Sequence, residues 1–332
     1  MHNVHAGLPG CADSVLGPSA IVEAAIIINR QAGSMRRDPE LADQLQTHCQ
    51  ARARHYVTSN AEELAAAARA VADSGAATVG ILGGDGSISH TLTALALAYT
   101  GRPLPRIGLL RGGTMNTIAS SLGIRQRCPR ALLARMLDAV QQPGRAPVRV
   151  LPSMQVGEQL GFLFGTGVWY GYLAESYVYG PPTRLTNAVV LGRLLASAAV
   201  GGSIYRRVRT RQRMHVRSSE GDWETRDYLT IAAGTVRDAG FGFRPFQHAF
   251  EHSDRFQLLA VKASPWAVLR DLPGLRFGRS LRASTAYDTS ACWAELSTES
   301  GQPFGYSVDG EVAMAHGPLR IAVGPSIEFL CL

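Results

Sequence analysis

Two glycine-rich turns, each placed directly after a short apolar run, constrain the fold of this chain most strongly. Residues 78–82 (TVGIL) lead into GGDGS, and residues 106–110 (RIGLL) lead into RGGT. A helix-like segment follows each turn. Short apolar strands that alternate with helices predict a parallel sheet covered on both faces. Both turns would then lie at the carboxyl edge of that sheet, where such folds bind their ligands.

The composition of the two turns suits an anion. Glycine lets the backbone approach a phosphate closely, and the N-terminus of the following helix offers free N–H groups and partial positive charge. Asp85 would repel a phosphate unless a cation lies between them or the carboxylate positions a hydroxyl. An ordinary strand-to-helix turn capped by Ser87 also explains the first turn, but two such turns favour a shared anion site. Neither turn matches G-x-x-x-x-G-K-[ST] or G-x-G-x-x-G, which argues against a P-loop enzyme and a simple dinucleotide dehydrogenase.

The second half of the chain has a different pattern. Short segments separated by glycine and proline turns predict an antiparallel β domain with one helix, at residues 183–199. The expected strands cover residues 161–165, 205–217, 227–233, 256–262, 291–296 and 319–323. The expected organisation is a flexible lead-in (1–20), an α/β domain (21–148), a β domain (149–318) and a C-terminal segment (319–332) that could return to the first domain.

Charge and cysteine content narrow the classes of partner. The 332 residues include 33 Lys and Arg against 26 Asp and Glu, and the net charge of +7 favours phosphates, nucleic acid or acidic lipid. The five cysteines form no C-x-x-C pair, which argues against a zinc site or disulfide framework and fits a reducing cytoplasm. No signal peptide is expected, and no run reaches the ~18 apolar residues of a membrane span.

Several ordered motifs resemble the diacylglycerol kinase catalytic-domain family, which includes sphingosine, ceramide and bacterial lipid kinases. GGDGSISHTLTAL and IGLLRGGTMNTIASSLGI resemble the family patterns G-G-D-G-T and L-P-x-G-T-x-N-D-x-A with a following L-G. Upstream, INRQAG resembles N-P-x-x-G, and Thr58 precedes the next helix as in the family. Downstream, GFG at 240–242 and VDGE at 308–311 resemble G-G-G and D-G-E. The resemblance spans about residues 24–332.

The resemblance implies a kinase of two domains. The first would be an α/β nucleotide-binding domain, Rossmann-like and related to phosphofructokinases and NAD kinases, and the second a β-sandwich that binds the lipid substrate. ATP and Mg²⁺ would bind in the cleft between them, and a lipid hydroxyl would take the γ-phosphoryl group. Diacylglycerol is the first expected acceptor, and a sphingoid base, ceramide or another lipid alcohol is the alternative.

The resemblance also assigns site residues. The nucleotide site would comprise Asn29, Gly33, Thr58, Gly83, Gly84, Asp85, Gly86, Ser87, Gly113, Thr114 and Asn116. Asp309 and Glu311 would supply the base, with Asp85 in the catalytic set and Glu311 as the favoured proton acceptor. If 309–311 is extended, the two carboxylates share one face of the strand. A D-G hairpin turn with acids at the surface is the alternative. A structural Mg²⁺ would be held by Asp254 and by main-chain oxygens of Glu251 and Phe256.

Departures from the family pattern keep two other functions open. Arg111 replaces a proline, Thr117 replaces an acid, and Arg255 replaces the glycine after the expected metal ligand. These departures are compatible with a non-catalytic nucleotide- or lipid-binding protein. The GGDGS turn is compatible with a sugar-phosphate kinase of the phosphofructokinase type.

Basic segments predict contact with a membrane. As a strand, residues 205–217 would carry Arg207, Arg209, Arg211, Arg213, His215 and Arg217 on one face, which could dock on anionic lipid. A solvated strand edge guarded by charge is the alternative. Residues 266–282 mix apolar and basic side chains as interfacial segments do. No nucleic-acid motif is present. We expect a cytoplasmic protein, peripheral at the inner face of the membrane, and a homodimer stays open.

Overall fold

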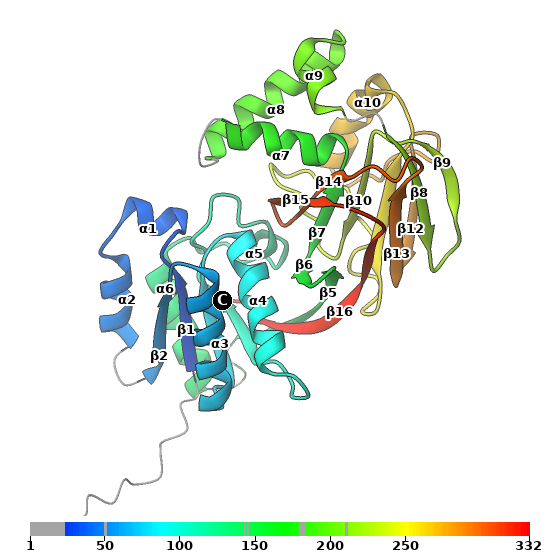
Figure 1. Cartoon of the computed structure of the whole chain (residues 1–332). Helices are drawn as coiled ribbons and strands as arrows, with labels where there is room; N and C mark the ends of the chain where they lie inside the picture. Colours follow the sequence, from blue (N-terminus) through cyan, green and yellow to red (C-terminus); the bar gives the residue numbers. More distant parts are fainter. Residues whose placement is uncertain (1–23, 50–51, 143, 145, 179–182, 210–211) are drawn as a thin grey trace, which may run out of the picture.

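A computed structural model describes residues 24–49, 52–142, 144, 146–178, 183–209 and 212–332 (Figure 1). The expected lead-in at residues 1–20 lies outside these ranges. The described residues form two β-sheets. The larger sheet begins with four parallel strands in the order β2-β1-β3-β4. They are β1 (Ala24–Asn29), β2 (Arg54–Thr58), β3 (Thr78–Leu82) and β4 (Arg106–Leu109).

Helices cover both faces of these strands. They are α1 (Gly33–Arg37), α2 (Leu41–Cys49), α3 (Ala61–Ser74), α4 (Asp85–Ala98), α5 (Thr117–Ser121) and α6 (Pro129–Gln141). Successive residues of a strand point to opposite faces. Ile26, Ile27 and Ile28 are nevertheless all buried, because α3 and α4 pack on one side and α2 and α6 on the other (Figure 1). The predicted parallel sheet is confirmed.

The C-terminal half is built mostly from antiparallel strands. They are β5 (Val148–Val156), β6 (Gln159–Gly161), β7 (Leu163–Thr166), β8 (Arg213–Ser218), β9 (Trp223–Asp227), β10 (Thr230–Gly234), β11 (Phe256–Val261), β12 (Ala286–Ala291), β13 (Trp293–Thr298), β14 (Phe304–Val308), β15 (Glu311–Ala315) and β16 (Leu319–Leu330). Six of them form an antiparallel sheet in the order β12-β11-β10-β7-β14-β15. The predicted antiparallel β region is confirmed.

Strand β16 connects the two halves of the molecule. Its first residues pair antiparallel with β13, and its last residues, Phe329 and Leu330, pair parallel with Ile107 and Gly108 of β4. The parallel sheet therefore continues through β16 into β13, β8 and β9. The domain boundaries expected from the sequence stay a prediction.

The six-stranded sheet has two different neighbours. On one face, Leu258 of β11 packs in a core with Met214 of β8 and Leu296 of β13, which gives the sandwich its interior. On the other face lies a layer of helices at the upper right of Figure 1. These helices are α7 (Val168–Val178), α8 (Arg184–Ala199), α9 (Ser203–Val208) and α10 (Pro265–Arg276).

The predicted strand over residues 205–217 is wrong in its first part. Residues up to Val208 belong to α9, and the strand β8 begins only at Arg213. Tyr205 and Val208 are buried three residues apart, which is helical spacing, whereas burial alternates along β8. Arg207 is therefore on a helix, and Arg211 lies outside the described residues. Three helices, α7, α9 and α10, were not expected in this half.

Candidate active site

Three turns meet at the carboxyl edge of the parallel sheet. They follow β1, β3 and β4, and they contact one another through their backbones. The Ser34 N–H donates to the Gly112 carbonyl at 2.9 Å, and the Gly112 N–H donates to the Gly83 carbonyl at 2.8 Å. A β-carbon on Gly84 would lie 3.1 Å from the α-carbon of Gly113. Glycine is needed here because two main chains approach closely.

Two asparagines hold these turns in shape. Asn29 donates from Nδ2 to Ser87 Oγ at 2.6 Å, which joins the first turn to the second. Asn116 has a left-handed φ of 52°. Its side chain accepts from the Gly113 N–H at 3.1 Å and donates to the Gly113 carbonyl at 2.8 Å. Both asparagine side chains therefore hold the glycine-rich turns in position through hydrogen bonds within the protein. Thr58 is buried and donates to the Ile28 carbonyl at 3.4 Å.

Asp85 links the second turn to the third. Its Oδ2 accepts from the Thr117 backbone N–H at 2.9 Å and from Thr117 Oγ1 at 3.0 Å, and its Oδ1 accepts from the Ile118 N–H at 3.2 Å. Burial raises the pKa of Asp85, and these hydrogen bonds oppose that rise. Thr117, a departure from the family pattern, is therefore the partner of this carboxylate.

Asp309 is buried. The expectation that Asp309 and Glu311 share one face of a strand is wrong. Asp309 and Gly310 are the two central residues of a tight turn between β14 and β15, with φ angles of 48° and 93°. The Asp309 carboxylate accepts from the N–H groups of Phe162 at 3.0 Å and Leu163 at 2.8 Å. It also accepts from the hydroxyl of Ser89, on α4. These contacts make Asp309 a positioning residue between α4 and the β6–β7 connection.

The pKa of Asp309 is raised to about 7, chiefly by burial and also by the nearby charge of Asp85, while the hydrogen bond from Ser89 opposes the rise. Asp309 is thus a buried carboxyl group, and the partly buried Asp85 lies close enough for its charge to act on it. Such a pair favours a bound proton because like charges in a buried site repel.

Glu311 occupies the position that a base requires. It is the first residue of β15, and a β-carbon on Gly86 would overlap its carboxylate. The carboxylate therefore lies over the first turn of α4. Tyr177 donates from its hydroxyl to the Gly310 carbonyl at 3.2 Å. Burial raises the pKa of Tyr177, and the charge of Glu311 adds to the rise.

A cavity of about 830 Å³ joins these groups to an apolar chamber. Its polar end is lined by seven of the predicted residues: Gly33, Gly84, Asp85, Gly86, Ser87, Gly113 and Thr114, with Asp309 and Glu311 beside them. Asn29, Thr58, Gly83 and Asn116 are not among its lining residues. The chamber is walled by α7, α8, α10 and the outer face of the six-stranded sheet. Sequence reasoning missed this chamber, although the many leucines of α8 were a usable signal.

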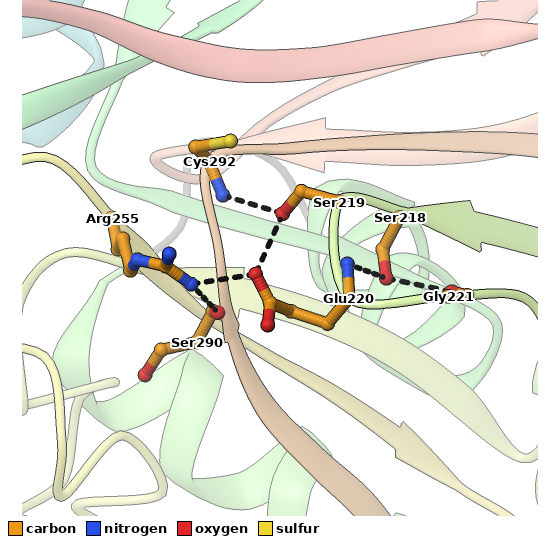
Figure 2. Close-up of polar contacts among 7 residues, drawn as sticks. All are labelled: Ser218, Ser219, Glu220, Gly221, Arg255, Ser290 and Cys292. Carbon is orange, nitrogen blue, oxygen red and sulfur yellow. Dashed lines mark hydrogen bonds and ion pairs between the residues drawn. The ribbon is translucent and has the colours of Figure 1, made fainter.

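The structural Mg²⁺ site predicted at Asp254, Glu251 and Phe256 stays a prediction, and Arg255 beside it has protein partners of its own. Arg255, next to Asp254, donates to Glu220 Oε1 at 2.6 Å and to the Ser290 carbonyl at 3.0 Å, as Figure 2 shows. A guanidinium already supplies positive charge at this end of the sandwich. In the described ranges, no group of three or more His, Cys, Asp or Glu side chains could hold a metal ion.

The arginines predicted to dock on lipid are paired with acids. Arg213 lies 2.6 Å from Glu299, Arg209 lies 2.8 Å from Asp227, and Arg217 lies 3.5 Å from Glu295. The positive charge of this strand is therefore largely compensated, which favours a solvated face. None of the helices in the described part of the chain is both long and apolar enough to span a bilayer.

Comparison with known proteins agrees with the predicted resemblance. Residues 23–145 match the family model of the diacylglycerol kinase catalytic domain. Lipid kinase YegS of Escherichia coli is 31% identical over 190 residues, which cover 55% of this chain and 56% of that protein. The match thus spans about half the length of this curated relative. A probable lipid kinase YegS from another Escherichia coli strain matches to the same extent.

Solved structures share the fold over nearly the whole chain. The crystal structure of a diacylglycerol kinase from Bacillus anthracis superposes with a TM-score of 0.61 at 12% identity, covering 94% of this chain and 98% of the other. A second protein from that organism, proposed to be a diacylglycerol kinase, superposes with a TM-score of 0.67 at 14% identity and the same coverage. At these identities the likeness shows the fold, and the predicted fold class is confirmed.

Proposed function

We propose that this chain, whose residues 23–145 match the family model of the diacylglycerol kinase catalytic domain, transfers the γ-phosphoryl group of ATP to the hydroxyl of a membrane lipid. The observation that carries the proposal is the continuity of one cavity, with glycine turns at one end and an apolar chamber at the other. Chain-like apolar substrates fit such walls, whereas a sugar phosphate needs polar groups on most sides.

The polar end of the cavity suits the phosphates of a nucleotide. The first turn of α4 borders the cavity at Gly84 to Ser87, and the first N–H groups of a helix have no partner within the helix. Arg36 also lines the cavity and brings a positive charge to this end. It would take the place of a lysine, because the only lysine of the chain, Lys262, lies in the other half.

Glu311 would act as the general base. The lipid hydroxyl gives its proton to the Glu311 carboxylate while the hydroxyl oxygen forms a bond to the γ-phosphorus. The bond between that phosphorus and the β-phosphate oxygen breaks, and ADP leaves. Asp309 and Asp85 would act through position, since their oxygens accept hydrogen bonds from the protein.

For a kinase of this family, we expect a divalent ion to accompany ATP. That ion would neutralise part of the phosphate charge. Asp85 was the expected contact for such an ion. Both of its oxygens already accept hydrogen bonds from the start of α5. We therefore assign Asp85 to alignment of the two glycine turns and derive no step through a metal.

Neutral lipid alcohols fit the chamber best. Apart from Arg36, Asp85, Asp309 and Glu311 at the polar end, its lining residues carry no charged side chain. Diacylglycerol and ceramide are neutral at the position next to the reacting hydroxyl, whereas a sphingoid base carries an ammonium group. Diacylglycerol is the first acceptor we propose, with ceramide next.

A transfer assay tests the proposal. The purified chain is incubated with γ-labelled ATP and, separately, with vesicles that contain diacylglycerol, ceramide or a sphingoid base, and with fructose 6-phosphate. We expect label in the lipid fraction, greatest with diacylglycerol, and transfer slower by about 10²-fold or more with the Glu311→Gln variant. Label in the sugar alone would show that the protein is a sugar-phosphate kinase. Nucleotide binding without transfer to any acceptor would show that the protein binds nucleotide but is not catalytic.

A further inference from the structure

Helix α8 is apolar on both of its sides. Leu191, Leu194 and Leu195 face inward and line the cavity. On the outer side, Leu185 is 75% exposed and Val189 is 43% exposed. The other exposed residues of the outer side are Ala188, Gly192, Arg193 and Ala196, so Arg193 is its one described charge. A helix at a water-facing surface normally presents polar residues outward, so the outer side of α8 is suited to an apolar environment.

Helix α10 extends this apolar surface. It packs beside α8 and, like it, lines the cavity from its inner side. Trp266 near its beginning is 63% exposed, and Phe277 just after its end is 83% exposed. Figure 1 shows α8, α9 and α10 together at the end of the molecule away from the parallel sheet. Exposed aromatic residues at both ends of a helix are typical of segments that enter the headgroup layer of a bilayer.

The positive charge of the protein is concentrated on the same helices. Residues 183–209 and 262–282 contain ten Arg and Lys residues and one acid, Asp271. The rest of the chain contains 23 Arg and Lys against 25 Asp and Glu. Asp271 is itself buried and lies 3.4 Å from Arg282. Arg207 and Arg209 pair with Glu175 and Asp227 from outside these ranges. The remaining positive charge of these helices, at residues such as Arg193 and Arg279, is complementary to anionic lipid.

We propose that this surface, which we call the α8–α10 face, docks on an anionic bilayer. It comprises the outer sides of α8, α9 and α10 with Leu185, Val189, Trp266 and Phe277. The same helices wall the apolar chamber, so docking would bring the bilayer next to the site that takes the acyl chains. The role of docking in delivering a lipid to the site rests on the proposed lipid kinase activity. The docking itself requires no catalysis.

A second copy of the chain is a poorer occupant of the α8–α10 face. A two-fold dimer would place the same positively charged surface against itself. Nucleic acid would satisfy the arginines but would leave the apolar side chains of α8 in water. A bilayer with anionic headgroups matches both features at once.

Vesicle flotation tests the proposal with variants of the full chain. The test variant is Leu185→Asp with Val189→Asp, and the control is Leu97→Asp on α4, where Leu97 is 74% exposed. We expect the native chain to float with phosphatidylcholine vesicles that contain phosphatidylglycerol, less so as salt increases. The double variant should bind at least about tenfold more weakly because two apolar contacts become two charges. The control should match the native chain.

Charge is tested separately with Arg193→Glu and Arg279→Glu together, against Arg69→Glu on α3 as control. We expect loss of binding only with the first variant. Equal flotation of all variants would overturn the proposal. A native dimer that the aspartate variants dissociate, without vesicle binding, would assign the face to self-association. Binding of a DNA duplex in place of vesicles would assign it to nucleic acid.

A soluble acceptor separates this proposal from the lipid kinase proposal. With a short-chain, water-soluble diacylglycerol, the aspartate double variant should keep native turnover while losing turnover on vesicles. If no form of the protein phosphorylates any lipid, the kinase proposal fails, and flotation still decides whether the α8–α10 face binds a bilayer.

Discussion

The carboxylate of Glu311 lies against the α-carbon of Gly86, at the first turn of α4. The contact is so close that a β-carbon on Gly86 would overlap the carboxylate oxygen. These two residues are 225 positions apart in the sequence, Gly86 in helix α4 and Glu311 at the start of strand β15. Their proximity brings the candidate base to the turn that is suited to bind phosphate.

Gly86→Ala should therefore displace Glu311 and lower kcat. A displacement of about 1 Å in a reacting group can cost about 10²-fold in rate, and we expect a loss of that order. The melting temperature should hardly change, because alanine is the better helix former and the overlapping group is the end of a flexible side chain. Steady-state kinetics and a thermal melt check both expectations.

Gly317→Ala is the control, since a β-carbon there meets nothing within 4 Å. It should leave kcat and the melting temperature as they are. A Gly86→Ala protein with native kcat would mean that the Glu311 carboxylate has no set position in catalysis.

Glu311→Gln tests the base directly. The amide keeps the size of the side chain but cannot accept the hydroxyl proton, so kcat should fall by about 10²–10⁴-fold. Nucleotide affinity, measured by calorimetry, should stay close to native, because the phosphates bind the glycine turns. Glu328→Gln, an exposed partner of Arg106, serves as the control. Equal losses in kcat and nucleotide affinity would point to general damage to the site.

Local signals made the parallel sheet and the glycine turns predictable. Apolar runs such as residues 78–82 are read from neighbouring residues, and a turn such as GGDGS needs its glycines whatever the rest of the chain does. Glu311 was predicted in another way, from the resemblance of VDGE to the D-G-E motif of the family.

Other features depend on contacts between distant segments. The burial of Asp309 arises from N–H groups of Phe162 and Leu163, far away in sequence, and no local pattern shows it. The arginine spacing of residues 207–217 fits a strand, but the buried Tyr205 and Val208 make its first part a helix. Leucines that line the chamber, such as Leu194, have the same sequence pattern as core leucines.

Asp85→Asn should weaken the link between the second and third turns. The carboxylate accepts three hydrogen bonds from the start of α5, and an amide can replace only some of them. We expect a loss of about 1–3 kcal/mol in the free energy of unfolding and weaker nucleotide binding. Chemical denaturation and calorimetry measure the two effects.

Asn60→Ala is the matched control for Asp85→Asn. It removes the side-chain cap of α3 and should cost about 1 kcal/mol in the free energy of unfolding. Nucleotide affinity should not change, because α3 begins outside the cavity. Weaker nucleotide binding in both variants would show that lost stability alone causes the effect.

Leu191→Trp should shorten the chamber. Leu191 lines the cavity from α8, and a larger side chain there would occupy volume that a long acyl chain needs. We expect kcat/KM to fall about tenfold or more for a long-chain acceptor and much less for a short-chain one. Leu97→Trp on the exposed side of α4 is the control. Equal losses for both chain lengths would remove the chamber from the acceptor site.

Asp309→Asn should change how stability depends on pH. The Asp309 carboxyl has a pKa of 3.8 in its ordinary state and about 7 in the folded protein, chiefly because of burial. Between these values the folded chain holds a proton that the unfolded chain has lost, so the contribution of Asp309 to stability falls as pH rises. It is fully present below about pH 4 and is lost by pH values above about 7.

The asparagine variant lacks this titration. We therefore expect the native chain to lose stability relative to the variant across this window, measured by urea denaturation at several pH values. A constant difference in the free energy of unfolding would show that the Asp309 carboxyl is ionised in the fold throughout.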